Sequence, residues 1–174
     1  ASAECAQNSI TCIAASKAFN LAGFQSAAVY IPNEGIRAVM DRGLNSDEVA
    51  EPNCFAIEST VAALTKGGEW LDQLNVSLAK NKQYVAEFLS ENLSELKLTK
   101  SGATYLLWVD VSALTKDAQE LCDFIRKETG LYITAGGQYR GNGASYVRIN
   151  IACPLAVVKD GMERLQKGVH AFKA

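Results

Sequence analysis

The sequence is poor in histidine, methionine and proline, and it has no long apolar run. Of its 174 residues, one is histidine (His170), two are methionine and three are proline. A single histidine excludes Ser-His and Cys-His nucleophile pairs and most zinc sites, so no metal site is expected. No apolar stretch is long enough to suit a membrane span. Any catalysis must therefore use lysine, arginine, a carboxylate, tyrosine or a bound cofactor.

The net charge does not favour binding to a nucleic acid or a membrane surface, and the cysteines do not favour a disulfide framework. The formal net charge is −2, which provides no basic surface for phosphates or lipid headgroups. The five cysteines are odd in number and widely spaced, with no C-x-x-C pair. Free thiols of this kind are typical of a reducing compartment, so a cytoplasmic location is expected.

Residues 1–95 predict an α/β segment followed by a long helix. Apolar runs at 10–15 and 27–31 are short enough to be strands, and Asn33 is a candidate N-cap for a helix ending near Gly43. After a break at Gly67, apolar residues recur every three or four positions, opposite lysines and glutamates. A helix of about 25 residues spans about 35–40 Å. Helices of that length often bridge two domains.

The remainder of the chain alternates strand and helix and predicts a small α+β sheet domain. Residues 105–111 predict a strand, and Thr115 and Gly130 predict the N-cap and the end of a helix. A short strand at 131–134 and a glycine-rich loop at 136–143 follow. The final pair of elements is a strand with regular alternation at 146–152 and an amphipathic helix after Pro154.

Lys17 is the only charged residue between Glu4 and Glu34. Apolar surroundings lower the pKa of an ammonium group, because desolvation penalises its charged form. A lysine of that kind is the type that forms Schiff bases with carbonyl compounds. The alternative is a lysine whose side chain extends from a short strand to the surface, and spacing alone favours that alternative.

Arg148 is the only charged residue between Arg140 and Lys159. It lies in the middle of a predicted strand, on the face that also carries Tyr146 and Asn150. A guanidinium held on a strand can bind a carboxylate through two parallel hydrogen bonds. The alternative, which composition leaves equally open, is an arginine that pairs with a structural carboxylate or lies on an exposed face.

Residues 16–23, SKAFNLAG, resemble the S-K-x-F-N-(I/L)-A-G segment around the cofactor lysine of C–S lyases of the MalY/PatB type. These lyases are cystathionine β-lyase-like members of the class I/II aminotransferase superfamily, which use pyridoxal phosphate (PLP). Residues 31–33, 68–71 and 102–110 continue the resemblance in the same order. It ends at residues 146–154, which are similar to the family pattern (F/Y)-V-R-(L/I)-N-x-A-C-P.

The resemblance implies roles for three residues. Lys17 bonds covalently to PLP and removes the α-proton once substrate has freed it, and Ser16 lies near the cofactor phosphate. Arg148 binds the α-carboxylate of an amino-acid substrate. Gln25 replaces the phosphate-binding arginine of aspartate aminotransferases and agrees with the lyase branch, whereas Ala14 lacks a hydroxyl that could bind the phosphate.

The implied fold is the carboxy-terminal portion of PLP fold type I. Residues 1–66 are expected to be a remnant of the large cofactor-binding domain, 67–95 the bridging helix and 96–174 the small domain. Only sixteen residues precede Lys17, so the family's upstream cofactor contacts are expected to be missing and the isolated chain to be inactive.

The implied activity of the full-length enzyme is β-elimination of a thiol from cystathionine or a cysteine-like substrate, giving pyruvate and ammonia. The small-molecule substrate is an amino acid, and the enzyme is expected to be a homodimer. An aminotransferase of the same superfamily is the first alternative, since it uses the same lysine and arginine. The second is a non-catalytic α+β module.

Overall fold

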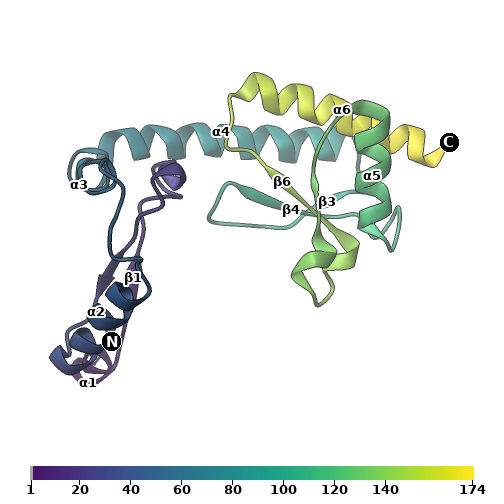
Figure 1. Cartoon of the computed structure of the whole chain (residues 1–174). Coiled ribbons are helices and arrows are strands. Elements are labelled where there is room, and N and C mark those ends of the chain that lie inside the picture. The colour runs from purple at the N-terminus through teal and green to yellow at the C-terminus, as the bar shows by residue number, and fades with distance from the viewer. Residues whose placement is uncertain (1) are drawn as a thin grey trace. The chain divides into compact units, whose positions relative to one another are not determined.

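The computed structural model describes residues 2–174 and divides into two compact units, Ala1–Leu74 and Asn75–Ala174. The boundary falls inside the longest helix, α4 (Gly68–Asn92). Figure 1 shows the order of the elements along the chain. Among the residues described, no helix is both long and apolar enough to cross a membrane.

The first unit combines a two-stranded antiparallel sheet with short helices. Strands β1 and β2 pair with Thr11 opposite Tyr30 and Ile13 opposite Ala28. Both strands lie within the apolar runs that predict them. The elements before α4 are α1 (Ala3–Gln7), β1 (Thr11–Ile13), η1 (Ala22–Phe24), β2 (Ala28–Tyr30), α2 (Glu34–Ser46) and α3 (Ala56–Lys66).

Helix α2 begins where the sequence predicts and ends later. The Oδ1 atom of Asn33 accepts a hydrogen bond from the Ile36 amide at 3.1 Å, which confirms the predicted N-cap. The predicted end at Gly43 is wrong by three residues. The amides of Asp47 and Val49 donate to the carbonyls of Gly43 and Leu44, both at 3.0 Å, and these bonds satisfy part of the last turn.

The second unit is a four-stranded antiparallel sheet with helices packed on one face (Figure 1). The strand order is β3-β4-β6-β5, with β4 and β6 in the middle. Alternation sends Leu107, Val109 and Val147 into the core that the helices cover. The elements are β3 (Lys97–Leu98), β4 (Leu106–Asp110), α5 (Ala118–Thr129), β5 (Thr134–Ala135), η2 (Gly136–Tyr139), η3 (Gly143–Ser145), β6 (Tyr146–Asn150) and α6 (Leu155–Lys173).

Helix α5 has both of its ends specified by the sequence. The N-cap is Asp117, whose carboxylate accepts from the Gln119 amide at 2.9 Å. The prediction of Thr115 as the cap is therefore wrong, although its hydroxyl accepts from the Asp117 amide at 3.0 Å and shapes the preceding turn. Gly130 ends the helix as predicted, with φ at 74°, a left-handed conformation that glycine adopts without strain.

Two further contacts fix α4 and α6 in the second unit. The buried amide of Asn81 donates to the carbonyls of Ile151 at 2.9 Å and Cys153 at 2.8 Å. These bonds satisfy two backbone carbonyls of the segment that follows β6. On α6, a Cβ atom at Gly168 would lie only 2.9 Å from a side-chain carbon of Ile125, so the missing side chain allows α5 and α6 to approach closely.

Candidate active site

Lys17 lies in a tight turn that follows β1. The amide of Phe19 donates to the carbonyl of Ala15, and the amide of Leu21 donates to that of Ser16, both at 3.0 Å. Asn20 completes the turn with a φ of 55°, in the left-handed region. The Lys17 side chain is exposed and, within residues 2–174, has no hydrogen bond or ion pair. Its amine is therefore open to a reaction partner.

The turn is held by Phe19, two residues after Lys17. The Phe19 ring stacks on Trp70 of α4, with ring centroids 6.0 Å apart and an interplanar angle of 27°. A Cβ atom at Gly67 would lie 2.6 Å from the Phe19 ring, whereas one at Gly68 would meet nothing within 4 Å. Gly67 is thus the glycine that makes room for Phe19, and this contact ties the lysine turn to the start of α4.

Ser16 lies next to Lys17 in the same turn and is half-buried. Its carbonyl is engaged by Leu21, while its hydroxyl has no hydrogen-bond partner among residues 2–174. Lys17 and Ser16 therefore come together in the first unit. Arg148, the third residue singled out by the sequence, belongs to the second unit.

Arg148 lies on the face of the sheet opposite the core. Trp108 of β4 and Thr134 of β5 are its direct neighbours across the strands. One guanidinium nitrogen, Nη2, is 3.5 Å from the Thr134 hydroxyl, which is a long hydrogen bond. The Nε atom is buried and has no partner, and no carboxylate of residues 2–174 forms an ion pair with the guanidinium. The structural ion pair that the sequence left open is absent from this part of the chain.

Arg148 contacts the first of three aromatic rings that pack in a row. Its Cζ atom lies 5.2 Å from the ring centroid of Tyr139. Trp108 meets Tyr139 edge-on at 5.5 Å and stacks on Tyr146 at 5.6 Å. An unpaired guanidinium beside aromatic faces is suited to binding an anion, because an unfilled buried donor gains most from an acceptor.

The sequence does not predict that Trp108, Tyr139 and Thr134 lie around Arg148. Strand register brings Trp108 and Thr134 beside Arg148, and no local pattern encodes that register. Tyr139 offered one signal, since it is the one aromatic residue in the predicted glycine-rich loop at 136–143. An aromatic side chain in a loop of small residues is often there to make a contact.

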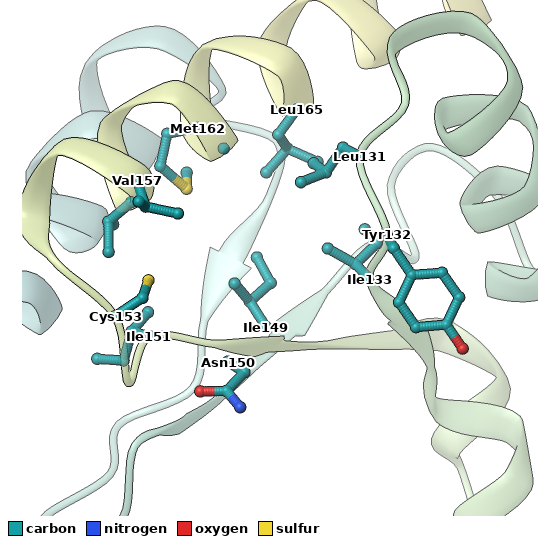
Figure 2. A pocket seen from close by; sticks show the side chains of 12 residues that line it. Leu131, Tyr132, Ile133, Ile149, Asn150, Ile151, Cys153, Val157, Met162 and Leu165 are labelled. Atoms are coloured by element: carbon teal, nitrogen blue, oxygen red, sulfur yellow. The ribbon is translucent and has the colours of Figure 1, made fainter.

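A separate apolar pocket lies between α6, β6 and the segment before β5. Its volume is about 220 Å³. Figure 2 shows Val157 and Met162 of α6 facing Ile149 and Ile133, while the Tyr132 ring lies to one side. No charged residue lines the pocket, and burial raises the pKa of the Cys153 thiol at its wall. The pocket cannot pair with the charges of an amino acid, so Arg148 marks the better candidate site in this unit.

Comparison with known proteins identifies the family. The profile of the aminotransferase class I and II family matches residues 2–165. Cystathionine beta-lyase PatB of Bacillus subtilis is 37% identical over 91% of this chain, and Protein MalY of Escherichia coli is 28% identical over the same share. The chain spans 41% of the length of each of these two relatives.

Solved structures agree with this result. Cystalysin from Treponema denticola, whose structure contains a pyridoxal 5'-phosphate cofactor, has a TM-score of 0.91 with 27% identity. The match covers 98% of this chain and 43% of cystalysin. The PLP-bound C-S lyase from Staphylococcus hominis has a TM-score of 0.80 with 32% identity, covering 92% and 42%. These matches confirm the prediction of PLP fold type I, and the chain belongs to the aminotransferase class I and II family.

Proposed function

We propose that these residues form part of a PLP-dependent enzyme that removes a thiol from cystathionine or a cysteine-like amino acid, releasing pyruvate and ammonia. One observation carries the proposal: the two isolated charges of the sequence, Lys17 and Arg148, are both without ion pairs in the structure. They occur in a chain that is 37% identical to a cystathionine β-lyase over nine tenths of its length.

The residues of the lysine turn fit the cofactor. Lys17 would hold PLP through its amine, which is exposed and unpaired, and the unpartnered hydroxyl of Ser16 would donate to the phosphate. When bound, PLP withdraws electrons from the substrate α-carbon, so that the α-proton and then the β-substituent can leave. Lys17 would accept the α-proton as general base.

The proposed role of Arg148 is to bind the amino-acid substrate. Its free guanidinium donors would bind the α-carboxylate, and a bidentate contact of this kind fixes the orientation of the bound amino acid. The lack of a competing carboxylate among residues 2–174 supports this role. A second candidate function is amino transfer, because an LL-diaminopimelate aminotransferase of Desulforudis audaxviator is 30% identical over 46% of the chain. The match to the lyase PatB covers 91% of the chain, about twice that share.

The domain organisation and assembly belong to the same proposal. Residues 1–66 are assigned to a large cofactor-binding domain, 67–95 to a bridging helix and 96–174 to a small domain. The enzyme is a cytoplasmic homodimer in this proposal. Exposed apolar side chains in the first unit, such as Phe55, Ile57 and Val61, support the presence of further protein surface around it.

The test measures pyruvate release from cystathionine by the full-length enzyme that carries these residues. Loss of a charged bidentate contact costs about 2–4 kcal/mol, so Arg148→Ala is expected to lower kcat/KM at least about thirtyfold. Arg126→Ala is the matched control, because Arg126 also lies over a tyrosine ring, 4.9 Å from that of Tyr132. The 174-residue chain alone is expected to be inactive.

The outcomes of these assays distinguish the proposed function from its alternatives. A change of less than about threefold for Arg148→Ala, roughly 0.65 kcal/mol, would remove Arg148 from the site. Transfer of the amino group to a keto acid, without release of pyruvate, would favour the aminotransferase. Turnover by the 174-residue chain at the rate of a whole lyase would show that the site is complete within it.

A further inference from the structure

The Arg148 side chain needs something other than hydrogen bonds to hold its orientation. Arginine has several rotatable bonds, and ordering such a side chain costs conformational entropy. Within residues 2–174, its one hydrogen bond is the 3.5 Å contact from Nη2 to the Thr134 hydroxyl, and its buried Nε has none. Neither feature can set the plane of the guanidinium, because one long bond leaves the group free to rotate.

The Tyr139 ring is the surface that can set this plane. Its centroid lies 5.2 Å from Cζ of Arg148, within the range of a favourable cation–π contact. The ring is itself supported by Trp108, edge-on at 5.5 Å, and Trp108 is stacked on Tyr146 at 5.6 Å with an interplanar angle of 12°. Arg148 therefore ends a continuous row of packed aromatic rings.

The loop that carries Tyr139 is closed by two glycines that lie against each other. A Cβ atom at Gly136 would lie 2.5 Å from the Gly143 carbonyl and 2.7 Å from that of Tyr146. A Cβ atom at Gly143 would overlap the Gly136 carbonyl. The short helices η2 and η3 can approach each other only because both positions lack a side chain. This close approach fixes the loop that presents Tyr139 to the sheet.

We propose that Tyr139 is a positioning residue, which holds the guanidinium of Arg148 in the plane that receives the substrate carboxylate. This inference rests on the proposed role of Arg148. The Tyr139 ring lies against the guanidinium, with its centroid 5.2 Å from Cζ, so a carboxylate approaches the guanidinium from the side that the ring leaves free, where it can accept bidentate hydrogen bonds. The phenol hydroxyl is not needed, since the contact is made by the ring face.

The first experiment is kinetic and uses the full-length enzyme with cystathionine. Tyr139→Leu is expected to raise KM about five- to twentyfold and to change kcat less than about threefold, because a partly desolvated cation–π contact and the orientation it gives are lost. Tyr139→Phe keeps the ring and is expected to stay within about twofold of the wild-type KM. Tyr132→Leu is the control, since Tyr132 contacts Arg126.

The second experiment does not depend on turnover. It measures by NMR the exchange of the Arg148 Nε–H proton with water in the 174-residue chain. Exchange is expected to be slow in the wild type, where Nε is buried, and at least about tenfold faster in Tyr139→Leu. Tyr139→Phe is expected to restore slow exchange.

The combined results separate this inference from the proposed function. Unchanged Nε–H exchange in Tyr139→Leu overturns the inference, whatever happens to KM. Faster exchange with an unchanged KM also overturns it, provided that Arg148→Ala lowers kcat/KM. If neither Tyr139→Leu nor Arg148→Ala affects kinetics while exchange accelerates, Arg148 is not the carboxylate anchor, and the proposed site fails together with the positioning role.

Discussion

The two units of the chain differ most in what they bury. Residues 75–174 enclose a single apolar core, built from α4, α5, α6 and one face of the sheet. In the first unit, by contrast, the buried apolar residues are Ala15, Ile31 and Ala56, two of which are alanines. Ten of its large apolar side chains are exposed: Ile10, Ile13, Tyr30, Val39, Val49, Phe55, Ile57, Val61, Leu64 and Trp70.

The difference shows which part of the chain is thermodynamically self-sufficient. Burial of apolar surface is the main driving force of folding, and a core of this kind offsets the conformational entropy of about 100 residues only narrowly. The second unit has such a core, and the first does not. Lys17 therefore lies in the unit that has little apolar core, and Arg148 lies in the unit that has a complete one.

The largest expected effect comes from separating the two units. A polypeptide of residues 68–174, which keeps α4 whole, is expected to unfold in one cooperative transition, because it contains every residue of the core. A polypeptide of residues 1–74 is expected to show no cooperative transition. Circular dichroism and urea titration measure both. Cooperative unfolding of residues 1–74 would contradict the comparison.

An intermediate effect is expected within the second unit from two glycines of α6. Gly168→Ala is expected to destabilise the unit by about 1–3 kcal/mol, because the new Cβ meets the Ile125 side chain at 2.9 Å. Gly161→Ala is the matched control: its Cβ would lie 3.8 Å from Leu131, and the higher helix propensity of alanine stabilises by up to about 1 kcal/mol. Equal stabilities of the two variants would contradict close packing of α5 on α6.

A smaller effect, about 1–2 kcal/mol, is expected from Asn81→Ala. This change removes two hydrogen bonds and leaves the carbonyls of Ile151 and Cys153 without the buried amide. Asn92→Ala removes two exposed bonds, one to the Phe88 carbonyl and a long one from Gln166 at 3.4 Å, and is expected to cost less than about 0.5 kcal/mol. Urea unfolding of both variants measures the difference, and a loss at Asn92 as large as at Asn81 would be inconsistent with this account.

The sequence predicted the elements whose pattern is strong and long. The three-four spacing of α4 and α6 and the glycine at the end of α5 were sufficient. Strand β3 was missed, because two residues carry no periodicity. The strand predicted at 131–134 lies instead at Thr134–Ala135, since Leu131 and Ile133 are apolar for packing against α6 and do not pair in the sheet.

The two charged residues of the candidate site can be predicted from the sequence, but the residues that surround Arg148 cannot. Lys17 and Arg148 stand out because each is alone among apolar or uncharged residues. The neighbours of Arg148 depend on the strand order β3-β4-β6-β5, which places Trp108 beside Arg148 although the two are 40 positions apart in the sequence. Strand order is set by the tertiary fold, so a local pattern cannot reveal it.

The central claim, that Lys17 carries the cofactor, is tested most directly by covalent trapping. The full-length enzyme that contains these residues is loaded with PLP, reduced with borohydride and digested, and the peptides are mapped by mass spectrometry. The account predicts a pyridoxyl adduct on Lys17, in the peptide that contains residues 16–23, and none in a Lys17→Ala variant. An adduct on another lysine, with Lys17 unmodified, would contradict it.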